Sequence, residues 1–215
     1  LVLWGGDRVQ ATSQLGDPIH AVAIEHRRDE PGSARAGERL HIATGDIVRT
    51  EDLRTRQTIG RITAPGVGAL AIDPTEPRLF LGDDEGTIST IELDLIGLGG
   101  PEVDITPVEL ASVGHPVDHL LVTDEGTVLA ASDADLTVID GSSGEILGRT
   151  EFTGIADLST AGAGPVVQGD PAAIPEPAAV AEVLAEVLGG DALDYESRIA
   201  NAATGTTVLF GSPGR

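Results

Sequence analysis

The sequence contains no cysteine, no methionine and no lysine in 215 residues, and its aromatic residues are one Trp, one Tyr and three Phe. Without cysteine the chain cannot form a disulfide scaffold, a thiolate metal cluster or a cysteine nucleophile. Without lysine it cannot form a Schiff base or use a P-loop lysine. The composition therefore excludes several enzyme mechanisms.

Positive charge is also scarce, because 35 acidic residues stand against 13 basic ones, all of them arginine, for a formal net charge of -22. Such a polyanion repels phosphate backbones, so we expect no nucleic-acid partner. Residues 27–61 hold eight arginines and six acids, whereas residues 62–148 hold seventeen acids and one arginine, Arg78. The asymmetry fits either a solvated acidic surface, as in a halophile, or a face that binds a basic partner or cations.

Long hydrophobic runs are missing too, since charge or glycine interrupts every apolar stretch well before the roughly 20 residues of a membrane helix. We therefore expect no membrane span in this segment. Residues 1–4 are too short for a signal peptide, and the chain does not begin with Met, so we expect a fragment of something longer. The lack of cysteine fits an oxidising exterior without requiring it, and an extracytoplasmic or membrane-attached location is our expectation.

What the sequence does contain is a repeat. An apolar ladder preceded by turn residues occurs at residues 20–25, 68–73 and 118–123, and residues 154–159 begin a further copy. A second apolar strand follows at 40–44, 79–82 and 128–132, and a third is predicted at 86–93 and 136–140. The β-branched residues and the Asp, Gly and Pro between these segments predict strands joined by hairpins. Each copy therefore reads as a four-stranded meander of about 40 to 50 residues, the size of a propeller blade.

The clearest copy spans residues 114–152. It has Gly114-His115 before the first strand, Glu125-Gly126 in the next turn, Asp133 or Asp135 before the third strand, and Ile139-Asp140 where WD40 blades often carry Trp-Asp. This copy resembles a WD40 or YVTN-type blade, and the resemblance covers about residues 15–155. It implies a mainly β fold of stacked four-stranded antiparallel meanders, a partial β-propeller of about three to four blades that binds a ligand or protein on its loops.

So few blades raise a problem of closure. Each blade buries its faces on two neighbours, and propellers typically close with four to eight blades. An open array would leave an apolar end face. We therefore predict that the native chain is longer or that a protein partner supplies the rest.

The pattern changes after residue 160, and we predict two regions: a propeller-like repeat region at 1–160 and a small α/β unit at 161–215. Strands are predicted at 164–168 and 206–210. Between them, an apolar stripe predicts a helix at 177–188, and Asp191 fits the N-cap of a second helix near 192–201. The unit is either separate or inserted into the next blade, and we favour a separate unit.

Candidate metal ligands lie in two acidic turns. Asp83, Asp84, Asp133 and Asp135 provide the hard oxygen ligands that calcium prefers, although turn chemistry alone also explains them. His115 and His119 are a weaker pair for zinc, because no third ligand is evident, and a structural role in a turn is the simpler interpretation. No other cofactor is expected.

No set of nucleophile, base and oxyanion donors converges in the sequence, so we nominate no catalytic residue. The Gly-Ser turns at 141–144 and 211–214 do not match the nucleophile-elbow pattern. We predict a non-catalytic binding, interaction or sensor module, the soluble part of a larger or membrane-attached protein. One alternative is an enzyme of a propeller family, such as a quinoprotein-like dehydrogenase or lactonase, that uses calcium and loop carboxylates. The other is a structural assembly protein with open end faces as its interface.

Overall fold

The computed structural model describes residues 2–5, 8–12, 18–26, 38–98, 105–132, 135–151, 155–161, 164–169, 181–182, 185 and 207–209. Three four-stranded antiparallel sheets account for most of them. The first sheet consists of β3 (Ile19–His26), β4 (Glu38–Thr44), β5 (Ile47–Asp52) and β6 (Gln57–Thr63). The second consists of β7 (Val67–Ile72), β8 (Arg78–Asp83), β9 (Thr87–Glu92) and β10 (Val108–Ser112), with the 3-10 turn η1 (Leu93–Leu95) after β9. The third consists of β11 (His119–Val122), β12 (Thr127–Ala131), β13 (Asp135–Asp140) and β14 (Ile146–Glu151).

Each of these sheets is a meander, in which strands that follow one another in sequence pair with one another. The three apolar ladders predicted from the sequence are the first strands β3, β7 and β11. The fold class predicted above, mainly β with stacked four-stranded antiparallel meanders, is therefore confirmed.

Two smaller sheets complete the described residues. The fourth sheet has the order β15 (Ile155–Ala161), β16 (Gly164–Gly169) and β17 (Thr207–Leu209), and all of its pairs are antiparallel. A two-stranded sheet near the N-terminus pairs β1 (Val2–Gly5) with β2 (Arg8–Thr12). The strands predicted at 164–168 and 206–210 are β16 and β17. Because both pair within the sheet that begins with β15, the strands on either side of residues 170–206 belong to one sheet.

The two predicted helices fall almost entirely outside the described residues. Within 177–188 the structure describes Ala181, Glu182 and Ala185, all helical, and it describes nothing of 192–201. The division into regions at residue 160 stays a prediction. Among the described residues, no helix has both the length and the apolar character needed to cross a membrane.

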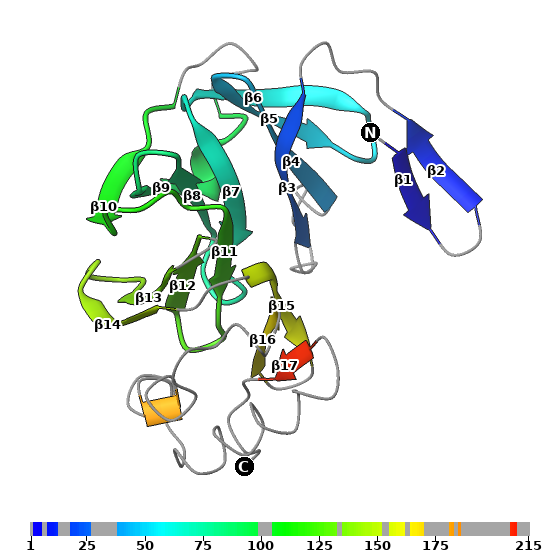
Figure 1. The fold of residues 1–215 in the computed structure, drawn as a ribbon. Helices are drawn as coiled ribbons and strands as arrows, with labels where there is room; N and C mark the ends of the chain where they lie inside the picture. The colour runs from blue at the N-terminus through cyan, green and yellow to red at the C-terminus, as the bar shows by residue number, and fades with distance from the viewer. Residues whose placement is uncertain are drawn as a thin grey trace.

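The sheets follow one another along an arc, with their first strands β3, β7, β11 and β15 on its inner side (Figure 1). Contacts join β3 to β7, β7 to β11 and β11 to β15, so each sheet lies against the next through its first strand. The stack therefore contains three complete four-stranded sheets and three strands of a fourth.

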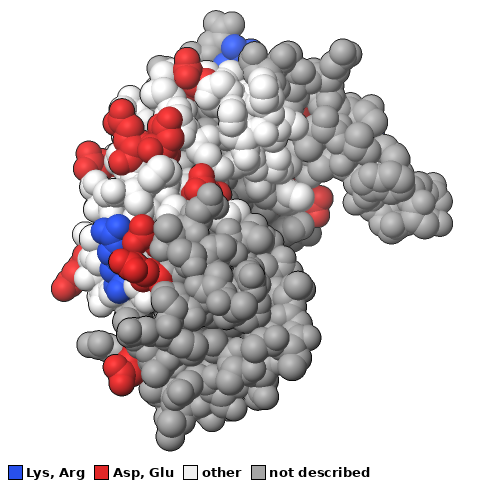
Figure 2. Space-filling model, in the orientation of Figure 1, with Lys and Arg blue, Asp and Glu red and all other residues white. Residues whose placement is uncertain are grey.

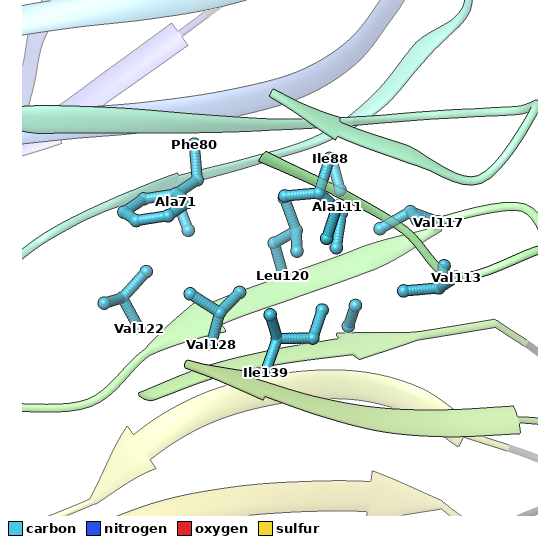
Figure 3. Close-up of a cluster of buried hydrophobic side chains, with 12 residues drawn as sticks. Ala71, Phe80, Ile88, Ala111, Val113, Val117, Leu120, Val122, Val128 and Ile139 are labelled. Carbon is cyan, nitrogen blue, oxygen red and sulfur yellow. The ribbon is translucent and has the colours of Figure 1, made fainter. Parts of the chain in front are cut away.

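The second sheet shows why these strands are apolar on both sides. Alternate residues of a strand point to opposite faces. Leu79 and Leu81 on β8 join the buried cluster shared with the first sheet, whereas Phe80 between them joins the cluster shared with the third. Figure 3 shows this second cluster, in which Phe80 and Ile88 meet Leu120, Val128 and Ile139. A strand buried on both faces needs a nearly continuous apolar run, which is what the sequence shows at 79–81 and 128–131.

Candidate functional site

One apolar surface in the described residues lies open, on the first strand of the first sheet. Val22 is 40% exposed, Ile24 is 43% exposed and Ile19 at the start of the strand is 38% exposed. Leu40 and Ile42, which pair with Ile24 and Val22 on β4, are fully buried. The exposed area is therefore confined to the inner strand of the sheet.

The position of Val22 is covered in the next two sheets. Strand pairing makes Leu70 on β7 and Leu120 on β11 the equivalents of Val22. Leu70 is 9% exposed and Leu120 is 8% exposed. The difference arises because β3 precedes β7 and β7 precedes β11 in the stack, whereas the described residues before β3 form the two strands β1 and β2.

Small side chains make the covered junctions possible. Ala69 and Ala71 of β7 lie in the same buried cluster as Leu120 and Val122 of β11. At the preceding junction, Ala21 and Ala23 of β3 pack against the cluster that holds Leu70. At both junctions, alternate alanines on one inner strand thus receive large side chains from the next.

A buried ion pair links the second sheet to the third. The Arg78 guanidinium lies 3.0 Å from Asp73 Oδ2, and the side chain of Asp73 is fully buried. Arg78 also donates a 2.9 Å hydrogen bond to the carbonyl oxygen of Gly141, in the third sheet. Burial alone would raise the pKa of Asp73, but hydrogen bonds from the Glu76 and Thr75 N–H groups, the Thr75 hydroxyl and Arg78 hold it below its ordinary value. Asp73 is therefore an ionised, fully partnered carboxylate at the end of β7.

An equivalent acid–arginine pair joins the first sheet to the second. Arg39 lies 3.8 Å from Glu25 Oε2 and donates a 3.1 Å hydrogen bond to the carbonyl oxygen of Leu93. Leu93 directly follows β9, as Gly141 directly follows β13. In the third sheet the corresponding pair is Thr123 and Thr127, whose main chains are joined by a 2.9 Å hydrogen bond. We call the acid–arginine pairs Glu25–Arg39 and Asp73–Arg78 the two clasps.

A carboxylate, an imidazole and a hydroxyl lie in line beside the first clasp. His41 Nε2 is 3.5 Å from Glu25 Oε2, and His41 Nδ1 is 2.9 Å from Thr50 Oγ1. These are the group types of a hydrolase triad. However, His41 and Thr50 are fully buried, so a substrate cannot reach the hydroxyl in this structure. The arrangement is a buried side-chain network within the first sheet, across β3, β4 and β5.

Three of the predicted calcium ligands, Asp83, Asp84 and Asp135, lie on one face of the molecule, and Asp135 lies at a different turn from the other two. In each sheet, the turn between the second and third strands lies on the same face as the link from one sheet to the next. Asp83 and Asp84 lie at the turn between β8 and β9, and Asp135 follows the turn between β12 and β13. Asp83 Oδ1 accepts hydrogen bonds from the N–H groups of Glu85 at 3.0 Å and Thr87 at 2.7 Å. The carboxylate thus closes its own turn, in which Gly86 adopts a φ of +87° and packs so closely on the main chain of His115 that a side chain would not fit.

The other three predicted ligands differ in their surroundings. Asp135 pairs with Arg149 at 3.2 Å, Asp84 is exposed, and Asp133 lies outside the described residues. Among the described residues, no group of three or more His, Cys, Asp or Glu side chains is placed to hold a metal ion. The calcium assignment stays a prediction. In Figure 2, acidic side chains are spread over the visible described surface, and the blue arginines beside them are few.

His115 and the Gly-Ser turn at 141–144, both singled out in the sequence, have structural partners. His115 is buried, with Nδ1 at 2.8 Å from the Pro116 carbonyl oxygen and Nε2 at 3.1 Å from Thr137 Oγ1. In the turn after β13, Asp140 Oδ1 accepts hydrogen bonds from the hydroxyls and N–H groups of Ser142 and Ser143. These bonds, the Ser142 hydroxyl first, lower the pKa of Asp140 to about 2. Both serine hydroxyls are donors to a carboxylate here.

Comparison with known proteins relates this stack to solved structures. No protein-family model matches the sequence, and neither does any curated protein. Among solved structures, the chain is similar to U3-55K (15% identity, TM-score 0.53) and to the RRP9 WD40 repeats (14% identity, TM-score 0.52). It covers 48% of each of those chains, over 79% and 80% of its own length respectively. The fold is that of part of a β-propeller, similar to the fold of the RRP9 WD40 repeats.

A third similar structure is Kuenenia stuttgartiensis Hydrazine Synthase, with 18% identity and a TM-score of 0.54 over 79% of this chain and 47% of that one. The chain thus spans about half the length of these three structures. At such identities the likeness concerns the fold alone. The WD40 resemblance stated from residues 114–152 is confirmed at this level.

Sequence reasoning missed the residues that join the blades of this propeller. It aligned residues 20–25 with 68–73, and so aligned Glu25 with Asp73, but it did not single out Arg39 and Arg78. Each arginine precedes a leucine at the start of the next strand, and this repeated Arg-Leu pair was the available evidence. The loop between acid and arginine differs in length between the two copies, which hides the pairing in the sequence.

Proposed function

We propose that the chain is a non-catalytic interaction module that binds a protein partner on the open face of its first sheet. One observation carries the proposal: Val22 is 40% exposed, whereas its equivalents Leu70 and Leu120 are buried. Ile24 is 43% exposed, whereas its equivalent in the third sheet, Val122, is buried and its equivalent in the second sheet, Ile72, is partly buried. Full burial of a Val or Ile side chain is worth about 1.5–3 kcal/mol. A partner that covered β3 would gain that free energy from a preformed, rigid strand.

The setting of the open face supports binding rather than chemistry. Hydrogen bonds within the described turns occupy Asp73, Asp83 and Asp140, which keeps these carboxylates in fixed structural roles. Propeller folds host enzymes as well as binding proteins, so the fold itself does not decide the function. The enzyme alternative requires a calcium site, which is tested separately below.

Site-specific photo-crosslinking tests the proposal. Since the sequence contains no cysteine, Val22→Cys provides a unique attachment point for a thiol-reactive photo-crosslinker. We expect a product with a protein of the source cell, and we expect Ile24→Arg to abolish it while the melting temperature changes little. Ile146, an exposed residue on the outer strand β14, provides the matched control as Ile146→Cys.

Two outcomes would count against the proposal. The same product from both positions, or a product unaffected by Ile24→Arg, would show that β3 is not the binding surface. A product made of two copies of this chain would instead support the structural assembly alternative.

A further inference from the structure

The hairpin β1–β2 stands in a recognisable place in the repeat. In each complete sheet, the third and fourth strands form a hairpin that directly precedes the first strand of the next sheet: β5–β6 precedes β7, and β9–β10 precedes β11. In the same way, β1–β2 directly precedes β3. Figure 1 shows this hairpin beyond the first sheet, on the side opposite the second. It therefore occupies the position of the third and fourth strands of a preceding sheet.

A third strand in a complete sheet pairs on both sides, as β5 pairs with β4 and β6. By contrast, β1 belongs to a sheet of two described strands and pairs with β2. Its other edge is where a second strand would pair, and a first strand beyond that would lie over β3. The exposed residues Val22 and Ile24 lie on this inner part of the first sheet, whereas Leu40 and Ile42 on β4 are buried.

The covered junctions define what the missing first strand must present. Ala21 and Ala23 pack toward the cluster of Leu70, and Ala69 and Ala71 pack with Leu120. By the same geometry, the strand over β3 must carry small side chains at two alternate positions. Larger ones would overlap Val22 and Ile24.

The two clasps define what the missing second strand must present. Arg39 and Arg78 begin second strands, and each donates to the carbonyl of the residue that follows the third strand of the next sheet. In the first sheet that residue is Leu53. Its N–H bonds to the Glu38 carbonyl, just as the N–H of Leu93 bonds to Pro77 and that of Gly141 to Gly126.

We infer that the protein partner of the open face is a two-stranded β-hairpin from polypeptide outside these 215 residues, which pairs edge-on with β1 and lies over β3. Its first strand carries small residues at alternate positions and ends in an acid, and its second strand begins with an arginine directed at the Leu53 carbonyl. The inference rests on the proposed function and specifies the chemistry of the partner.

A duplicated segment of the chain itself provides the probe. Residues 64–87 contain β7, β8 and the turn after them, and so include Ala69, Ala71, Asp73 and Arg78. Fused directly before Leu1 of the full chain, this segment supplies a first and a second strand in the correct order ahead of β1. We expect amide hydrogen exchange in residues 19–25 to slow by about tenfold or more, and the melting temperature to rise by several degrees.

Matched controls carry changes in the duplicated segment alone. Ala69→Leu with Ala71→Leu should remove the protection of β3, and Arg78→Gln should reduce it. The inference is wrong if the unchanged segment gives no protection, or if the leucine variant protects equally. If the segment fails while crosslinking at Val22 still captures a protein, then this inference falls and the proposed function stands. If the segment gives no protection and crosslinking at Val22 captures no protein, both this inference and the proposed function are wrong.

Discussion

The open face of the first sheet and the covered face of the third differ in their neighbours and hardly in their side chains. Val22 and Ile24 are as apolar as Leu120 and Val122, yet the first pair is exposed and the second pair is buried. The apolar pattern of a strand therefore specifies a stack of sheets, not a single sheet.

The junctions between sheets differ in a second way. Clasps link the first sheet to the second and the second to the third, whereas Thr123 and Thr127 take the place of acid and arginine in the third sheet. Apolar packing gives stability without fixing one geometry, whereas an arginine that bonds to a particular carbonyl selects one relative position of two sheets. The two clasped junctions are thus more narrowly specified than the one that follows.

The largest effect is expected from breaking a clasp. Arg78→Met should reduce the free energy of unfolding by about 3 kcal/mol, because the buried Asp73 carboxylate loses its charged partner. Chemical denaturation measures the change. Arg149→Met is the control, since the Arg149–Asp135 pair is more exposed and should contribute below about 1 kcal/mol. Equal losses in the two variants would refute the distinction between clasp and surface pair.

One substitution made on both faces sharpens the comparison of neighbours. Val122→Ala should reduce the free energy of unfolding by about 2 kcal/mol, because it removes two buried methyl groups and leaves a cavity. Val22→Ala makes the same chemical change at a 40% exposed position and should cost below about 0.5 kcal/mol. The comparison is read from urea midpoints at constant m-value, and a loss at Val22 as large as that at Val122 would show that β3 is already covered.

The turn after β13 should show a smaller, pH-dependent effect. The pKa of Asp140 is about 2 in the folded protein, below its ordinary value of 3.8. A lowered folded pKa means that this stabilisation is present above about pH 4 and is lost as the pH falls toward 2. Asp140→Asn should cost about 1 kcal/mol at neutral pH.

Melting temperatures measured from pH 7 to pH 2 test this prediction. The unchanged protein should lose stability between pH 4 and 2 more steeply than Asp140→Asn does. Part of the slope should remain in the variant, because the pKa values of Asp52 and Asp73 are lowered as well. Parallel curves for the two proteins would show that the turn does not stabilise the fold through the charge of Asp140.

The smallest effect is expected from calcium. Titration calorimetry should show no tight stoichiometric binding, because Asp83 closes its own turn and Asp135 pairs with Arg149. Tight binding that Asp133→Ala abolishes would contradict this expectation and favour the enzyme alternative. Asp94→Ala serves as a control for non-specific binding to an acidic surface.

The sequence predicted strands and turns well because these depend on local patterns. Residues 68–73 and 79–82 were expected as strands and form β7 and β8, since β-branched and apolar runs between turn residues favour strands. The clasps were missed because the reach of Arg78 to Gly141 depends on how two sheets pack. The sequence predicted an open apolar end face, but it could not show that Val22 lies on it, because that also depends on how the sheets pack.

The hairpin between β16 and β17 has a consequence for how this chain tolerates change. Gln168 and Thr207 are paired, so residues 170–206 leave and re-enter the fourth sheet at adjacent points. The entropy of closing a chain connection grows only slowly with its length. Evolution or an engineer could therefore lengthen, shorten or replace this stretch without shifting the pairing of β16 with β17, which makes it a suitable point for grafting a new domain onto the stack.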